Sequence, residues 1–213
     1  DALLRVLGYA YRTREEHVLT YTHDEYWIPK SIGRNWNAEI RRSILSVFAK
    51  NLGLHGWCDA AWTDPSVEGW FVMCGNSAID WRTALIKVVC ASSAEAEICS
   101  GCSISRRLVF IRNLFQDLGI LIQGQVPLFI DADACIKHTN KDGVSKRTAH
   151  FLRWQSTLRW MNLHCYVIAS FVYTHEQLAN LLTKPVDLQE FRNFCKRFFN
   201  YASRHISPTT VFV

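Results

Sequence analysis

The pattern of apolar and polar positions changes near residue 56. Before it, residues 2–12 fit a short amphipathic helix, 21–37 have the polar character of a loop, and apolar positions recur at helical spacing from Ile40 to Phe48. After it, short apolar runs alternate with longer amphipathic segments. We therefore expect a helical N-terminal extension followed by an α/β domain.

Five short apolar segments of this domain predict β-strands, at 57–62, 69–74, 77–81, 126–130 and 163–173. The Gly75-Asn76 pair favours a tight hairpin, so the early strands should be antiparallel. The later strands are separated by helical segments and should run parallel through crossovers.

Helical periodicity predicts the remaining elements, at 93–118, 133–138, 145–161 and a last region that begins at 174, is interrupted at Lys184-Pro185 and resumes over 187–201. A five-stranded mixed sheet with helices on both faces would bury all of these apolar surfaces.

Composition supports a folded domain and narrows its environment. The 213 residues are 49% hydrophobic and 20% charged, and the net charge of +5 is a mild basic excess compatible with a polyanionic partner. No apolar run approaches the roughly 18 to 20 residues that span a bilayer, so no membrane partner is expected. Because the sequence begins with Asp1, we expect a processed or partial polypeptide.

Eight cysteines stand mostly within apolar stretches, where free cysteine behaves as a small hydrophobic residue. This favours a reducing intracellular compartment, with nucleus, cytoplasm and organelle matrix left open. Cys99 and Cys102 form a single CxxC pair, and zinc would need two further ligands. Two core thiols on one helix are therefore the favoured interpretation.

Two aspartates stand where an exposed charge would be unusual. Asp59 lies inside the first predicted strand, although aspartate is disfavoured in strand interiors. Asp131 ends the buried fourth strand, close to the carboxyl edge where sites gather in parallel sheets. Capping of the following helix remains the alternative for Asp131.

The long helix offers two glutamates with different surroundings. Glu95 stands three residues after Ser92 and fits a capping box, which is a sufficient structural role. Glu97 lies about 200° further round the helix. It begins the stripe expected to pack on the sheet, which continues through Gly101, Ile104, Leu108, Ile111, Phe115 and Leu118.

Asp59, Glu97 and Asp131 are therefore predicted to meet at one edge of the sheet. Three clustered carboxylates repel one another, and divalent cations relieve that repulsion. Oxygen ligands suit Mg²⁺ or Mn²⁺, and two such ions can activate a water for phosphodiester hydrolysis.

Six sequence blocks, in order, resemble the ribonuclease H domain of copia-type retrotransposon polyproteins. They are GWCDAAW at 56–62, AIDW at 78–81, SSAEAE at 92–97, ID at 130–131, RTAH at 147–150 and EQLANLLTKP at 176–185. Residues 2–21 also resemble the segment that joins the polymerase to this domain. On this basis we divide the chain into an extension (1–55), a ribonuclease H-like domain (56–201) and a tail (202–213).

The resemblance implies a fold similar to cellular ribonuclease H and cleavage of the RNA strand of RNA–DNA hybrids with two Mg²⁺ ions. Asp59, Glu97 and Asp131 match three of the four expected carboxylates, and Asn180 stands at the fourth. An amide can ligate a metal without adding charge. His175 loosely matches a histidine thought to help product release in cellular ribonuclease H, although a surface turn is the favoured interpretation.

Other departures from the family pattern motivate a second hypothesis. Ala61, Ala132 and Leu152 replace expected polar residues, and 22–54 replaces a short linker with a basic insertion. They indicate a diverged or domesticated relative. It would be a catalytically degenerate module that binds RNA, or a structural subunit of a ribonucleoprotein that contacts other proteins through the insertion.

Basic residues gather after residue 136 and predict contacts to a nucleic-acid backbone, which requires charge more than sequence. The candidates are Lys137, Lys141, Lys146, Arg147 and Arg153. A solvated helix face is the alternative. Trp27 and Trp36 in the insertion are expected to anchor the extension more readily than to stack on bases.

Overall fold

The computed structural model describes residues 53–75, 77–140 and 151–198. The predicted N-terminal helices, residues 22–52 of the insertion and the tail lie outside the described residues, as do Lys141, Lys146 and Arg147. The proposed domain boundaries therefore remain predictions.

Residues 55–85 form three strands, and the rest of the described chain alternates helices with two further strands. The elements are β1 (His55–Ala61), β2 (Val67–Cys74), β3 (Ser77–Leu85), α3 (Ser93–Asp117), β4 (Val126–Ile130), α4 (Asp133–Asn140), α5 (Leu152–Leu163), β5 (Val167–Phe171), a 3₁₀ turn η2 (Thr174–Glu176), α6 (Asn180–Thr183) and α7 (Leu188–Phe198). The sheet order is β3-β2-β1-β4-β5. Strands β1 to β3 pair antiparallel, whereas β4 pairs parallel with β1 and β5. The predicted mixed five-stranded sheet is confirmed.

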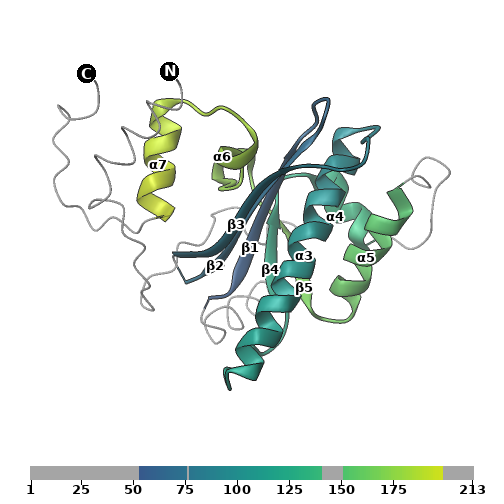
Figure 1. The fold of residues 1–213 in the computed structure, drawn as a ribbon, viewed down its shortest axis with the longest axis vertical. Coiled ribbons are helices and arrows are strands. Elements are labelled where there is room, and N and C mark those ends of the chain that lie inside the picture. Colours follow the sequence, from purple (N-terminus) through teal and green to yellow (C-terminus); the bar gives the residue numbers. More distant parts are fainter. Residues whose placement is uncertain (1–52, 76, 141–150, 199–213) are drawn as a thin grey trace, which may run out of the picture.

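Helices cover both faces of the sheet, as predicted (Figure 1). On one face, α3 and α5 bury an aliphatic core that includes Ile104, Leu108 and Leu158. On the other, the segment from Leu178 to Cys195 packs on Trp57 and Phe129. Strand alternation explains the two cores, because successive side chains of β1 and β4 point to opposite faces.

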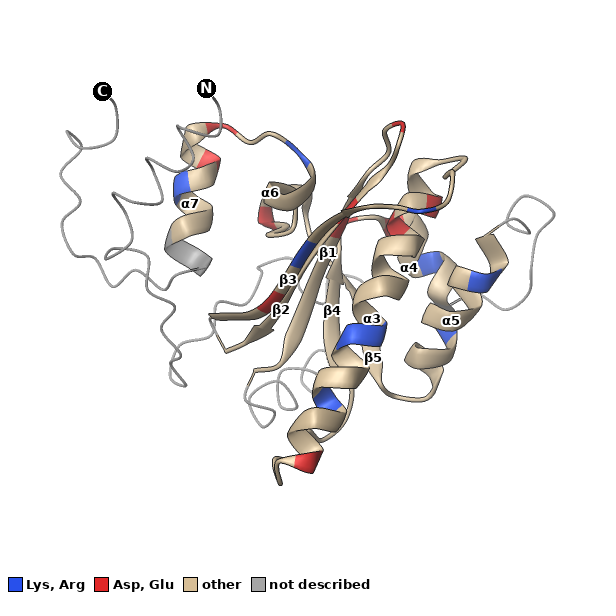
Figure 2. Cartoon of the chain, viewed as in Figure 1, with Lys and Arg blue, Asp and Glu red and all other residues tan. Residues whose placement is uncertain are grey.

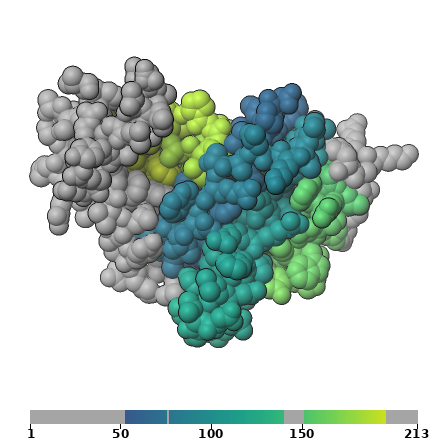
Figure 3. Space-filling model, viewed as in Figure 1, coloured from purple at the N-terminus to yellow at the C-terminus, as the bar shows by residue number. Residues whose placement is uncertain are grey.

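Gly56 brings α3 close to β1. A Cβ atom there would lie 2.7 Å from Ile104 Cδ1 and 2.9 Å from Leu108 Cδ1. The buried stripe of α3 begins at Glu97 and runs as predicted to Ile111. It ends before Leu118, which is 66% exposed because α3 projects past the sheet. Figure 3 shows α3 as a ridge along one face of the molecule.

The fifth strand is shorter than the sequence pattern predicted. It begins at Val167, because α5 continues to Leu163 and closes with backbone bonds from His164 to Trp160 O and from Tyr166 to Met161 O. Cys165 has a positive φ of 59° in this turn and is exposed, so its predicted place in the fifth strand is wrong.

All eight cysteines are free thiols, and Cys99 and Cys102 are both buried on α3. This agrees with the interpretation of that pair as core residues. Among the described residues, every helix is too short or too polar to cross a membrane.

Candidate metal centre

The site lies where β1 and β4 separate. Their parallel pairing ends at Trp57 and Phe129, so Asp59 and Asp131 follow two residues later on neighbouring strands. The Gln177 side chain lies at this point. Its Nε2 donates to the carbonyl of Cys58 at 2.9 Å and to that of Phe129 at 3.4 Å. These carbonyls are thereby satisfied where the ladder stops.

The start of α3 brings Glu97 to the same place. Ser92 caps the helix by accepting from the Glu95 backbone, and the Glu95 carboxylate accepts from the Ala91 backbone at 2.7 Å. The Glu95 carboxylate is therefore engaged in capping the first turn of α3. Glu97 instead accepts from the Ala60 backbone at 3.3 Å and is only 7% exposed.

Asp59, Glu97 and Asp131 each offer a carboxylate oxygen, and these three oxygens lie within 4.8 Å of one another. Asp59 is fully buried. The second oxygen of Glu97 is also buried and has no hydrogen-bond partner among the described residues. A buried carboxylate oxygen without a donor is costly. The cluster therefore fits a hard divalent cation that prefers oxygen ligands.

The electrostatics of the metal-free cluster follow from burial and like charge. Burial, then the charges of Asp59 and Asp131, raises the pKa of Glu97 well above its ordinary value. Burial and the charge of Asp59 also raise the pKa of Asp131. The fold thus holds these acids in a place that disfavours their own ionised form.

Helix α6 places a cation beside the acids. The Lys184 ammonium lies 3.0 Å from Asp59 Oδ1 and 3.2 Å from the side-chain oxygen of Asn180. The Thr183 hydroxyl donates to the other oxygen of Asp59. The Asn180 amide donates to the Thr174 carbonyl at 2.8 Å, which orients its oxygen toward Lys184.

His175 lies beside this arrangement. It is exposed and stacks on Tyr173, with ring centroids 5.4 Å apart. It shares the lining of a cleft of about 440 Å³ with Gln177 and Asn180. The structure thus gathers Asp59, Glu97 and Asp131, with Asn180 joined to them through Lys184, and places His175 on the adjoining surface.

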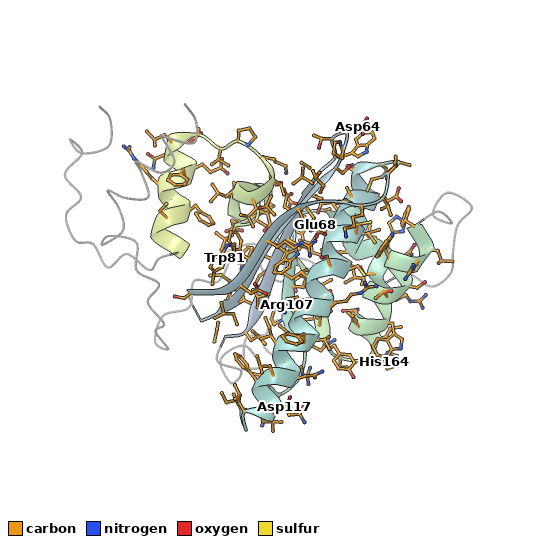
Figure 4. All side chains as sticks on the ribbon, in the orientation of Figure 1. Asp64, Glu68, Trp81, Arg107, Asp117 and His164 are labelled. Atoms are coloured by element: carbon orange, nitrogen blue, oxygen red, sulfur yellow. The ribbon has the colours of Figure 1, made fainter. Side chains whose placement is uncertain are left out.

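Basic residues lie on α3, α4 and α5 (Figure 2). Of the predicted backbone contacts, Lys137 is exposed and pairs with Asp133 on α4. Arg153 is exposed and lies 5.7 Å from the ring centre of Trp154, as does Arg106. A second cleft, of about 570 Å³, is lined by Arg82, Lys87, Arg106 and Arg107 among others. Figure 4 shows Arg107 on the side of α3 toward the strands, and it pairs with Asp80 on β3.

Sequence reasoning missed Lys184, Thr183 and Gln177. Thr183 and Lys184 stand in the block EQLANLLTKP, where the pair Lys184-Pro185 predicts a helix interruption. Gln177 stands three residues after Thr174, and this spacing predicts a capping box at a helix start. That interpretation is wrong, because η2 is capped at Tyr173 without a side-chain bond and Gln177 is buried against the sheet. The one sequence signal for the role of Gln177 is its position shortly after the end of the predicted fifth strand.

We predict that Glu97→Gln stabilises the metal-free protein by about 1 kcal/mol, or about 3 °C in melting temperature. The amide keeps the acceptor for Ala60 and removes the buried charge. Since the folded pKa is raised, wild-type stability should fall as pH rises above the unfolded value of about 4.3, and the variant should lack this loss.

Thermal melts in chelator across this pH range measure the effect. Glu95→Gln is the matched control and should lower the melting temperature, since it weakens a cap. Equal melting curves for wild type and Glu97→Gln at every pH would contradict the prediction.

The strand order and directions are those of the ribonuclease H-like fold. The three acids come from β1, from the start of α3 and from the residue after β4. The chain is also a distant homologue of copia-type Pol polyproteins.

It is 28% identical over 196 residues to the retrovirus-related Pol polyprotein from transposon RE2 of Arabidopsis thaliana, covering 90% of this chain and 14% of the relative. It is also 28% identical over 151 residues to the retrovirus-related Pol polyprotein from transposon RE1 of the same plant. This match covers 68% of this chain and 10% of the relative. The chain therefore spans a small part of these curated relatives. No protein-family model matches it.

Two solved structures are similar in outline. One is the RNase H1 of the archaeon Halobacterium salinarum, with a TM-score of 0.42 and 15% identity over 59% of this chain and 89% of that one. The other is the N-terminal RNase H domain of a Mycobacterium tuberculosis protein fused to maltose binding protein. Its TM-score is 0.43 and its identity 13%, over 61% of this chain and 89% of that one.

Proposed function

We propose that this domain is a metal-dependent ribonuclease that hydrolyses the RNA strand of RNA–DNA hybrids. The observation that carries the proposal is the cluster of Asp59, Glu97 and Asp131, with a buried Glu97 oxygen that has no donor among the described residues. The substrate class follows from the resemblance of six blocks to the ribonuclease H domain of copia-type polyproteins and from the distant homology to Pol polyproteins.

The three acids would hold Mg²⁺ or Mn²⁺. Bound there, divalent ions supply activation of a water and stabilisation of the leaving oxygen of a phosphodiester. The protein contributes the positions of the ligands. Asp59 is fixed by Thr183 and Lys184, and Glu97 by the Ala60 backbone, so the acids are ordered before substrate arrives.

Substrate contacts would come from charge on the helical side of the molecule. Lys137 and Arg153 present exposed cations, and the guanidinium groups of Arg106 and Arg153 each lie 5.7 Å from the centre of the Trp154 ring. Such contacts position a backbone without reading sequence. A hybrid would be distinguished by shape and by its 2′-hydroxyls. The free thiols lead us to propose a reducing intracellular compartment.

The test is cleavage of an end-labelled RNA–DNA hybrid by the full chain in Mg²⁺ or Mn²⁺. Cleavage of the RNA strand is expected, with none in chelator and none of a DNA duplex of the same sequence. Intact hybrid in both metals would overturn the proposed activity.

A second candidate rests on the pairing of Lys184 with Asp59 and Asn180, which occupies part of the cluster with a protein cation. It is the degenerate module that binds RNA or serves a ribonucleoprotein. Tight hybrid binding with neither Mn²⁺ binding nor cleavage would favour this candidate over the nuclease.

A further inference from the structure

Lys184 is placed inside the acidic centre. Its ammonium is within hydrogen-bond distance of Asp59, which is fully buried, and of the amide oxygen of Asn180, which is 6% exposed. The lysine side chain itself is 43% exposed and reaches in from the end of α6. The pairing joins residues 125 positions apart, so it comes from tertiary packing and not from a local helix pattern.

The charge balance of the cluster explains why a lysine suits this place. Three carboxylates carry a formal charge of −3, and Asn180 adds none where the family resemblance implies an acid. A single divalent ion and one ammonium together bring +3. A centre with this composition is neutral, whereas two divalent ions together with the same ammonium would leave it at +2.

The carboxylate oxygens of the cluster also fall into two groups, those that already accept hydrogen bonds and those that do not. Both oxygens of Asp59 already have donors, namely Lys184 and Thr183. The buried Glu97 oxygen has none among the described residues, and Asp131, half-buried beside it, is hydrogen-bonded by the Thr174 side chain. Glu97 therefore supplies the unused ligand capacity next to Asp131, whereas the side formed by Asp59 and Asn180 is filled by the ammonium.

We propose that Lys184 serves as the second cation of this centre, so that the domain takes one divalent ion per chain. The proposal rests on the nuclease function proposed above and specifies its metal content. Lys184 acts as a positioning residue through Asp59, and Asn180 is the residue that makes the arrangement favourable, because its oxygen accepts from an ammonium without an added charge.

The experiment is a titration of the full chain with Mn²⁺ as the probe, followed by the electron paramagnetic resonance signal of free Mn²⁺. The wild type is expected to bind one ion. Lys184→Met should bind its first ion about tenfold more tightly, because a nearby positive charge is removed. The double variant Asn180→Asp with Lys184→Met should bind two ions.

Lys87→Met is the matched control, because Lys87 is an exposed lysine in the loop before α3. It should leave the affinity and the stoichiometry unchanged. Circular dichroism melts show whether each variant is folded, and the single Lys184→Met variant carries the test if the double variant does not fold.

The outcomes separate the two proposals. Two ions bound to the wild type, or one ion with equal affinity in wild type and Lys184→Met, would overturn the role of Lys184 and leave the nuclease proposal standing. No Mn²⁺ bound by the wild type or by any folded variant would overturn both. Binding by Lys184→Met alone would show that the ammonium excludes the ion, and would overturn both the single-ion content and the nuclease activity of the natural chain.

Discussion

Replacing Asp59 with asparagine is expected to lower the rate of hybrid cleavage about a thousandfold, which corresponds to about 4 kcal/mol in the activation barrier. Asp59 is the fully buried acid of the carboxylate cluster. It accepts hydrogen bonds from Lys184 and Thr183. The asparagine amide has nearly the same shape as the carboxylate but carries no charge. It therefore weakens the binding of the divalent ion and leaves Lys184 beside a neutral group. The loss should appear in the maximal rate at saturating metal.

Asp117→Asn is the matched control for this prediction. Asp117 ends α3, and Figure 4 shows it at the tip of the helix that projects past the sheet. This variant should cleave at the wild-type rate. Unchanged cleavage by a folded Asp59→Asn protein would show that the cluster does not perform the reaction.

Gly69→Ala is expected to give the largest loss of stability, about 3 kcal/mol from overpacking. Gly69 lies on β2 opposite Asp59 in the ladder, and α6 sits directly on it. A Cβ atom there would lie 2.6 Å from Leu182 Cβ and 2.7 Å from Thr183 Cγ2. Neither atom is the far end of a flexible side chain, so α6 must move.

The expected fall in melting temperature is about 6–12 °C for a chain of this size. Displacement of α6 also moves Thr183 and Lys184 from Asp59, so Mn²⁺ affinity should change as well. Gly119→Ala provides the comparison. Its Cβ would meet nothing within 4 Å, and only its positive φ of 80° opposes the substitution. About 1 kcal/mol is expected there. Equal melting temperatures for the two variants would contradict the close seating of α6 on β2.

The sequence was most informative where local pattern and burial agree. The fourth strand was predicted at 126–130 and spans Val126–Ile130, because a short apolar run between turns has few alternatives. The choice of Glu97 over Glu95 followed from helical geometry, and Glu97 is the one that lies with Asp59 and Asp131. Fold class and the gathering of three acids were therefore within reach of sequence reasoning.

The rest of the site depends on contacts that no local pattern encodes. Lys184 reaches Asp59 only because α6 packs on β1 and β2, and Gln177 reaches β1 only because the chain returns across the sheet after β5. The end of α5 was misjudged for a related reason. A turn with positive φ at Cys165 looks, in sequence, like the beginning of an apolar strand.

The Gln177 bridge has a consequence for how the acid pair is spaced. Paired strands lie about 4.8 Å apart, and Asp59 and Asp131 would face each other at that spacing if the ladder continued. Instead, the ladder stops at Trp57 and Phe129, and one amide group holds the two carbonyls beside the break. A single side chain in the segment after β5 thus bridges β1 and β4 next to both acids. We expect insertions or deletions in that segment to alter the spacing of Asp59 and Asp131 without changing either acid.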